Sequence, residues 1–103
     1  MANYLLVFHG GAMPESPEEG AKVMQAWTAW FSELGEALVD GGNPASATKT
    51  IAPNGAVSDD ASGPSGYSIL KADSLDAAVA LAKGCPVLHG GASIQVVETF
   101  NAM

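Results

Sequence analysis

The fold is decided by one stretch near the start of the chain, Tyr4-Leu5-Leu6-Val7-Phe8. Apolar side chains occupy both alternating sets of positions in this stretch. That pattern is typical of a strand that is buried on both faces, and therefore of the centre of a sheet. We expect a central strand here, ended by His9-Gly10-Gly11.

A long amphipathic helix is expected to follow that strand. Ser16 is a good N-cap, Pro17 suits the first helical position, and Glu19 completes the spacing of a capping box with Ser16. The glycine pair Gly41-Gly42 is expected to end the helix. The apolar residues that recur at helical spacing in between are Val23, Trp27, Trp30, Phe31, Leu34 and Leu38.

The middle of the chain favours a modest strand and loops. Ser46–Ala52, in which Thr48 and Thr50 alternate with smaller residues, is predicted to be an edge strand. Pro53-Asn54-Gly55 is a strong turn signal, and we interpret the acidic, Gly- and Pro-rich Ser58–Gly66 as a flexible loop.

The final third of the chain predicts a third strand, a second helix, a loop and a last strand. The helix is capped by Asp73 or Ser74 and is rich in alanine, which allows close packing. Its inner stripe is expected to comprise Leu75, Ala78, Val79 and Ala82. The four segments are, in order, Tyr67–Ala72, Leu75–Lys83, Cys85–Gly91 and Ser93–Thr99.

The order strand, helix, strand, strand, helix, strand predicts a single α+β domain over residues 1–103. The expected architecture is ferredoxin-like, βαββαβ, with a four-stranded antiparallel sheet and two helices on one face. The other face of such a sheet also needs cover. A second copy of the sheet is the simplest cover, so we expect a homodimer that pairs through its sheet faces.

Composition and charge exclude several classes of partner. The chain has eleven acidic residues, four lysines and no arginine, which gives a net charge of −7. Binding to nucleic acid or to an anionic membrane is therefore not expected, because both need a basic surface. The single cysteine, Cys85, cannot form an intrachain disulfide, and the apolar Tyr4–Phe8 is too short to be a signal or a membrane span, so we expect a cytoplasmic protein.

The chain resembles the YCII-related proteins of the dimeric α/β-barrel superfamily. The resemblance implies a ferredoxin-like fold and a dimer. A histidine in the first helix and an aspartate before a proline have been proposed as an active site in some YCII-like members. Here Gln25 is the nearest match to the histidine, and Cys85 stands before the proline, so the resemblance lends no catalytic residue. The residues that carry it are Tyr4–Phe8, the helix ending near Gly41-Gly42, Asp59/Asp60 to Gly63-Pro64, Gly66–Ile69, Ala72–Ala78, Gly84-Cys85-Pro86 and His89-Gly90-Gly91.

The two histidines are the candidate catalytic residues. In the expected sheet the end of the first strand, with His9, meets the start of the last strand, which His89 precedes. A histidine at this rim could act as a general base, because its unperturbed pKa lies near neutrality. The alternative is that His9 merely ends a strand and that His89 is solvated in a loop.

Four further residues are candidates for binding a ligand near that rim. Cys85 shares a loop with His89, Trp27 or Trp30 could border a cleft between helix and sheet, and Tyr67 opens the third strand. The alternatives are ordinary core positions for the tryptophans, a small buried residue for Cys85, and a hydroxyl in water for Tyr67. We expect neither a metal site nor an organic cofactor, because no motif indicates one.

Three kinds of function remain open from the sequence. The first is a small-molecule-binding dimeric module with a cleft between helix and sheet. The second is a small cofactor-independent enzyme, isomerase- or oxygenase-like, that uses a histidine as general base. The third is a purely structural role.

Overall fold

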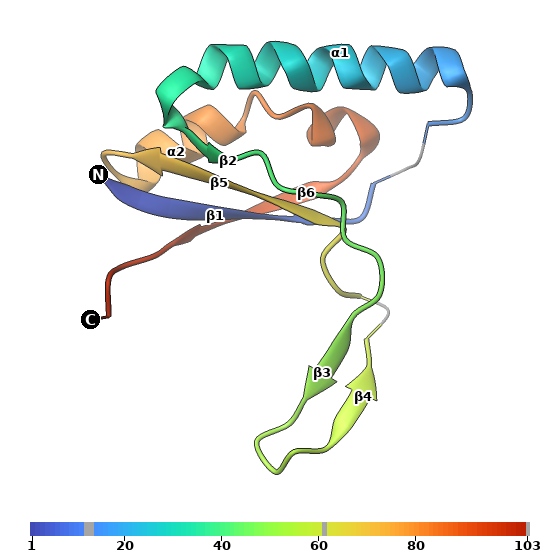
Figure 1. The fold of residues 1–103 in the computed structure, drawn as a ribbon, viewed down its shortest axis with the longest axis vertical. Coiled ribbons are helices and arrows are strands. Elements are labelled where there is room, and N and C mark those ends of the chain that lie inside the picture. The colour runs from blue at the N-terminus through green and yellow to red at the C-terminus, as the bar shows by residue number, and fades with distance from the viewer. Residues whose placement is uncertain (12–13, 61, 103) are drawn as a thin grey trace.

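The computed structural model describes residues 1–11, 14–60 and 62–102 of the chain. It is an α+β protein in which two α-helices cover one face of a four-stranded antiparallel sheet (Figure 1). A separate two-stranded hairpin projects from one end of this body.

The sheet has the strand order β2-β5-β1-β6. Strand β1 (Ala2–His9) lies between β5 (Gly66–Ala72) and β6 (Ser93–Glu98), so the prediction of a central first strand is confirmed. Strand β2 (Leu38–Asp40) pairs with the other side of β5 and forms one edge.

Helix α1 (Pro17–Leu34) begins where the sequence predicts. The Ser16 hydroxyl accepts a hydrogen bond from the backbone N–H of Glu19 at 3.2 Å, which satisfies one of the free donors of the first turn. The Glu19 carboxylate in turn accepts from the backbone N–H of Glu15 at 3.1 Å. The N-terminus of the helix is therefore fixed by its own sequence.

The end of α1 differs from the prediction. Gly35, with φ of 53°, caps the helix, and its N–H donates to the carbonyl of Phe31. A short 3-10 turn, η1 (Gly35–Ala37), then leads into β2, so Leu38 belongs to the edge strand and not to the helix. The expectation that the helix runs to Gly41-Gly42 is wrong because a glycine that adopts positive φ ends the helix earlier.

Gly41 and Gly42 have a different role, at the edge of the sheet. A Cβ atom on Gly42, whose φ is 74°, would lie 1.7 Å from the carbonyl oxygen of Tyr67. The carbonyl of Gly41 accepts a hydrogen bond from the buried Ser68 hydroxyl at 2.8 Å. These glycines allow the chain after β2 to lie directly against β5.

Helix α2 (Leu75–Ala82) is capped by Ser74, whose hydroxyl accepts from the N–H of Ala77 at 3.1 Å. Ala78 and Ala82 are buried as predicted, but Leu75 is 42% exposed, so its assignment to the inner stripe is wrong. Leu75 begins the helix, ahead of the turn that meets the sheet. A 3-10 helix, η2 (Pro86–Gly90), occupies the segment that we interpreted as a loop.

The hairpin, which we call the arm, comprises β3 (Lys49–Ile51), β4 (Val57–Asp59) and the turn between them. Ser46–Ala52 is therefore not the edge strand of the main sheet, since β3 pairs with β4. The prediction of a loop from Ser58 is likewise wrong, because β4 extends to Asp59. The radius of gyration, 15.1 Å, exceeds the roughly 13 Å of a compact domain of this length, because the arm stands out from the body.

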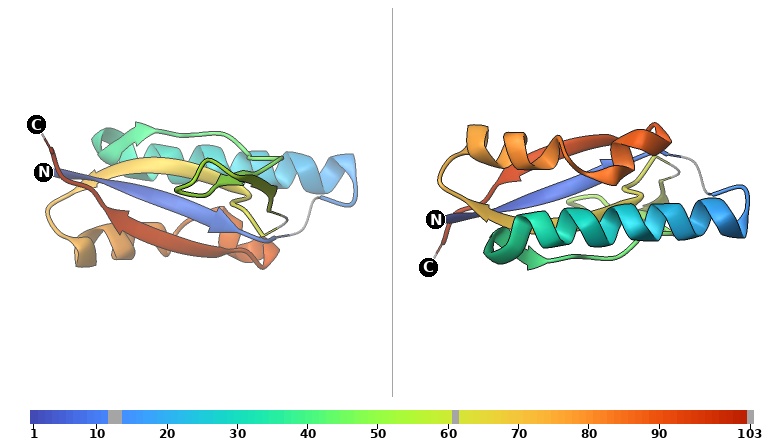
Figure 2. Two further views of the ribbon diagram at one scale, coloured as in Figure 1. Left: turned by 90° about the horizontal axis from the view of Figure 1, so that it is seen from below. Right: turned by 90° about the horizontal axis from the view of Figure 1, so that it is seen from above.

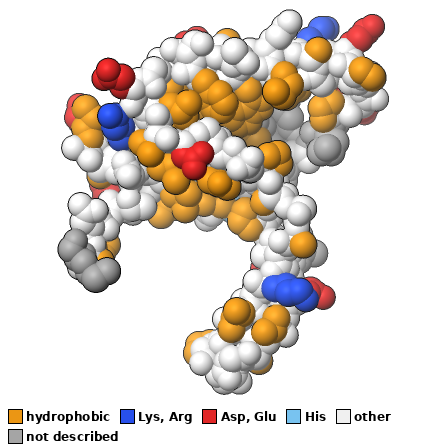
Figure 3. Space-filling model, viewed as in Figure 1, with side chains coloured by type: hydrophobic (Ala, Val, Ile, Leu, Met, Phe, Trp, Pro, Cys, Tyr) orange, Lys and Arg blue, Asp and Glu red, His pale blue; other side chains and the backbone are white. Residues whose placement is uncertain are grey.

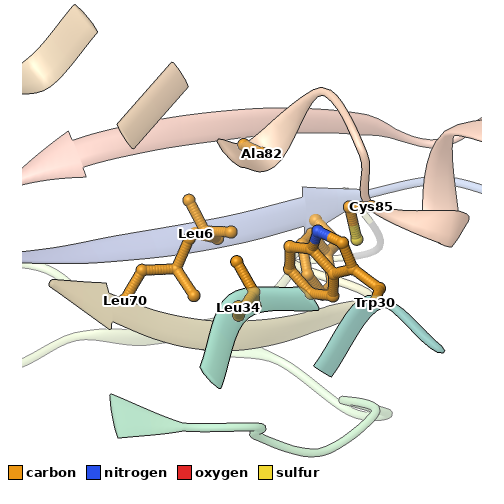
Figure 4. Close-up of a cluster of buried hydrophobic side chains, with 7 residues drawn as sticks. Leu6, Trp30, Leu34, Leu70, Ala82 and Cys85 are labelled. Atoms are coloured by element: carbon orange, nitrogen blue, oxygen red, sulfur yellow. The ribbon is translucent and has the colours of Figure 1, made fainter. Parts of the chain in front are cut away.

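The core lies between the helices and the sheet (Figure 4). Along β1 the even-numbered residues Tyr4, Leu6 and Phe8 are buried against the helices, and the intervening residues are partly or fully exposed. The buried side chains of the main cluster are Leu6, Phe8, Trp30, Leu34, Leu70, Ala82 and Cys85. Across residues 1–11, 14–60 and 62–102, no helix has the length and apolar character needed to cross a membrane.

Candidate functional site on the open face of the sheet

The helices leave one face of the sheet open (Figure 2). We call the side chains of β1, β5 and β6 that point away from the helices the open face. Its apolar part is formed by cross-strand neighbours, because Leu5 pairs with both Ile69 and Val97, and Val7 follows on the same side of β1. The members of the open face are Asn3, Leu5, Val7, His9, Tyr67, Ile69, Lys71, Ser93, Gln95 and Val97.

The open face carries no carboxylate from β1, β5 or β6, whose residues the structure describes throughout. Glu98 is the one acid in these strands, and it pairs with Tyr4 on the helix side. The Tyr4 hydroxyl donates a hydrogen bond to Glu98 at 2.9 Å, which holds that carboxylate away from the open face. A chain with eleven acids thus places no acid on this face from these three strands, and Lys71 lies at one end of its apolar part.

His9 and Gln95 form the polar end of the open face. His9 pairs with Ser93, and Gln95 lies two residues further along β6, diagonally across the two strands. The distance from His9 Nε2 to Gln95 Oε1 is 2.7 Å. Because an amide oxygen can only accept, this contact assigns the proton of a neutral His9 ring to Nε2 and leaves Nδ1 as the proton acceptor.

Tyr67 lies in the adjacent row of the same face. Val7 pairs with Tyr67 on one side and with Gln95 on the other, so the three residues form a row across the sheet beside His9. Tyr67 is partly exposed. This end of the open face therefore combines an imidazole, an amide and a phenol above an apolar valine.

The structure brings the two predicted strand ends together, but the two histidines lie on opposite sides of the sheet. The pairing of His9 with Ser93 places the end of β1 beside the start of β6, as predicted. The alternation along β1 directs the His9 side chain to the open face, whereas η2, which carries the exposed His89, lies in the helix layer against α1. His9 therefore has Gln95 as its neighbour.

Cys85 lies in the core, on the helix side of the sheet, with 1% of its surface exposed. Burial raises the pKa of the Cys85 thiol to about 11, and a hydrogen bond with the backbone of Val87 offsets only part of that effect. Roughly one thiol in ten thousand is then ionised at pH 7, which does not suit a nucleophile. This placement matches the interpretation of Cys85 as a small buried residue.

The two tryptophans also lie in the core between α1 and the sheet. Trp30 is buried, and its indole Nε1 donates to the carbonyl of Leu81 at 3.2 Å. The ring of Trp27 lies 5.8 Å from that of Phe8 and 5.6 Å from those of Trp30 and Phe31, measured between centroids. These four rings pack against one another between helix and sheet.

Two hollows lie elsewhere on the surface. One, of about 310 Å³, is at the base of the arm, and one, of about 360 Å³, lies between the two ends of the chain. The first contains Asp60, whose carboxylate accepts hydrogen bonds from the hydroxyl and the backbone N–H of Ser62 at 2.6 and 2.9 Å. These bonds lower the pKa of Asp60 and already occupy one of its oxygens. Among the residues that the structure describes, no group of three or more His, Cys, Asp or Glu could hold a metal ion.

Gln95 is the residue that sequence reasoning missed as part of a site. The alternation in the last strand assigns it to the side opposite Ile94 and Val96, which pack on the core. The same alternation in the first strand assigns His9 to that side. Pairing the two strands in register would have found the contact, but the register depends on the whole sheet.

Comparison with known proteins gives no match to a protein-family model and none to a curated protein. The functional proposal therefore rests on the geometry of the open face.

Proposed function

We propose that the protein is a homodimeric module that binds a small molecule at the His9 end of the open face. The strand order β2-β5-β1-β6, with the arm inserted between β2 and β5, supports a ferredoxin-like fold and the relationship to YCII-related proteins. The free, buried Cys85 supports a reducing, cytoplasmic location.

The observation that carries the dimer is the uncovered apolar surface of the open face. Leaving such surface in water costs about 25 cal/mol for each Å² that could be buried. A two-fold dimer covers the same patch on both copies at once, so one surface serves as both halves of the interface. Strands β1, β5 and β6 place no carboxylate on this face, and Asp40 of the edge strand β2 lies beside Ile69. Two molecules of net charge −7 can therefore meet over β1 and β6 without direct repulsion between acids of these strands, which favours a second copy.

The ligand site is proposed at His9, Gln95 and Tyr67. Small-molecule sites typically combine an apolar lining with a few polar groups that orient the ligand. Here Val7 supplies the lining, His9 Nδ1 accepts a hydrogen bond, and the Tyr67 hydroxyl donates or accepts one. A small, neutral ligand with both a donor and an apolar part fits this chemistry, and its second wall would come from the partner copy.

An enzyme that uses His9 as general base is the second candidate. The hydrogen bond from Nε2 to Gln95 at 2.7 Å favours it, because it fixes the tautomer and leaves Nδ1 to accept a substrate proton. In that case the reaction would be a proton abstraction or an isomerisation of the bound ligand, without an organic cofactor.

The dimer is tested with two valines of equal exposure. Val97 on the open face and Val23 on α1 are both 41% exposed. We expect sedimentation equilibrium to give a dimer for the wild type and for Val23→Lys, and a monomer for Val97→Lys. Lysine lowers the net negative charge, so added repulsion between the acidic chains cannot cause the loss. A monomeric wild type, or equal effects of both variants, would exclude this interface.

The ligand site is tested with the two histidines as a matched pair. The protein is titrated with a library of small neutral metabolites and followed by ¹H–¹⁵N NMR. We expect a binding compound to shift the Gln95 side-chain amide and the backbone of Val7, and to lose affinity in His9→Gln but not in His89→Gln. Shifts centred on η2, or no binding in the whole library, would contradict the proposal. If a bound compound is turned over, the enzyme becomes the leading account.

A further inference from the structure

The arm is the part of the chain that the proposed ligand site does not use. Its two strands pair with each other, and Ile51 lies opposite Val57 on one side of the hairpin. These two side chains are 70% and 59% exposed, respectively. An isolated two-stranded hairpin is at best marginally stable in water. The exposed apolar pair on the arm therefore indicates that the arm packs against another surface.

The base of the arm is joined to the sheet by backbone hydrogen bonds that follow the chain outward from β5. The N–H of Tyr67 donates to Asn43, that of Ala45 donates to Ser65 at 2.9 Å, and that of Asp60 donates to Thr48 at 3.1 Å. The two connecting segments therefore stay paired between the body and the arm, which gives the arm a defined direction.

That direction is away from the helices, on the side of the open face (Figures 1 and 2). The space-filling view shows hydrophobic side chains along the underside of the body and on the arm, with a concave space between them (Figure 3). A molecule that covers the open face therefore enters the space beside the arm. The arm and the open face therefore border the same concave space.

The charge of the arm suits an acidic partner such as a second copy of this chain. Lys49 and Asp59, the charged residues of the two strands, form an ion pair at 3.0 Å and cancel each other. The arm therefore adds no net negative charge where a second molecule of net charge −7 would approach.

We propose that the arm of each copy packs against the other copy in the dimer, with Ile51 and Val57 as its contact residues. Each subunit is thereby in contact with the arm of its partner. This inference rests on the proposed homodimer, and it adds a second, separable contact to the one made by the open face.

The first test is the affinity of the dimer, measured by sedimentation velocity over a dilution series. Ile51→Thr/Val57→Thr removes the apolar contact and keeps β-branched residues in both strands. We expect it to raise the dimer Kd by roughly tenfold or more, because two apolar side chains lose their contact. The control, Thr50→Ser/Ser58→Thr, exchanges hydroxyl residues at the neighbouring cross-strand pair and should leave the Kd unchanged.

The second test locates the contact directly. Protein labelled with ¹³C at the isoleucine methyl groups is mixed with unlabelled protein, and isotope-filtered NOEs are recorded. We expect NOEs from the Ile51 methyl groups to the unlabelled copy. NOEs that arise only within one copy would mean that the arm folds onto its own sheet, and this would overturn the proposal.

The two proposals fail in different ways. A dimer that Val97→Lys dissociates, but that keeps its Kd in the arm variant and shows no intermolecular NOE from Ile51, overturns the arm contact alone. A wild type that stays monomeric throughout the dilution series overturns the homodimer, and the arm contact with it.

Discussion

At the scale of single residues, Gly42 marks a close approach of the chain to β5 at the edge of the sheet. We expect Gly42→Ala to lower the free energy of unfolding by more than about 2 kcal/mol, because the new Cβ meets the carbonyl of Tyr67 at a φ of 74°. Urea unfolding followed by circular dichroism measures the loss. Gly91→Ala is the control, since Gly91 also has positive φ, 87°, but its Cβ would meet no atom within 4 Å. Equal losses in the two variants would show that crowding contributes nothing.

Cys85 gives a prediction about pH. Its pKa is raised from 9.0 to about 11 by burial, so the folded protein holds the thiol proton more tightly than the unfolded chain does. The raised pKa of Cys85 contributes about 3 kcal/mol to the free energy of unfolding. This contribution is fully present below pH 9 and is lost as the pH rises towards 11. Urea unfolding at several pH values should show this fall in the wild type relative to Cys85→Ala. Parallel pH curves for the two proteins would refute it.

The candidate site could be predicted from the sequence in position but not in orientation. The meeting of His9 with the start of the last strand follows from the order of the elements, and the pairing of His9 with Ser93 agrees with it. Which face His9 occupies depends on the register of β1 against the helices, a tertiary property. The place of His89 depends on a 3-10 helix that packs on α1, for which its local sequence gives no clear signal.

At the scale of elements, starts were easier to predict than ends. Ser16 and Ser74 cap the two helices through their side-chain hydroxyls. Because capping requires such a side chain, the start of a helix can be recognised in the sequence. Gly35 and Gly42 both have positive φ, so the end of α1 depends on which of them caps the helix. Gly35 is the cap, and Leu38 then pairs with Leu70 at the edge of the sheet. The pattern that suggested a longer helix arose because Leu38 also faces the core, as a strand residue.

The N-cap of α1 is open to a direct measurement. We expect Ser16→Ala to destabilise the protein by about 1 kcal/mol, because the N–H of Glu19 loses its acceptor. Ser32→Ala, at an exposed position within the same helix, should change stability by no more than a few tenths of a kcal/mol. Thermal unfolding of both variants measures the two changes in stability. If Ser16→Ala leaves the stability unchanged, water replaces the hydroxyl as the acceptor for the Glu19 N–H.

At the scale of the whole molecule, the chain is a two-layer body with one face left open. The apolar pattern of the first strand predicted burial on both faces, whereas in the described chain the helices cover Leu6 and Phe8 but not Leu5 and Val7. The arm was not predicted as a separate element, because an isolated hairpin and an edge strand have the same local pattern. Only the position of β2 in the sheet distinguishes them.

The acidity of the whole chain predicts how the proposed dimer responds to salt. Each copy carries a net charge of −7, and β1, β5 and β6 place no carboxylate on the open face that joins the two copies of the proposed dimer. Long-range repulsion therefore opposes association while the contact itself is apolar. Raising the ionic strength from about 0.01 M to about 0.1 M shortens the screening length from about 30 Å to about 10 Å. We expect the dimer Kd, measured by sedimentation over this range, to fall as salt is added. An interface held by ion pairs would weaken instead, and a Kd that rises with salt would exclude the open face as the main contact.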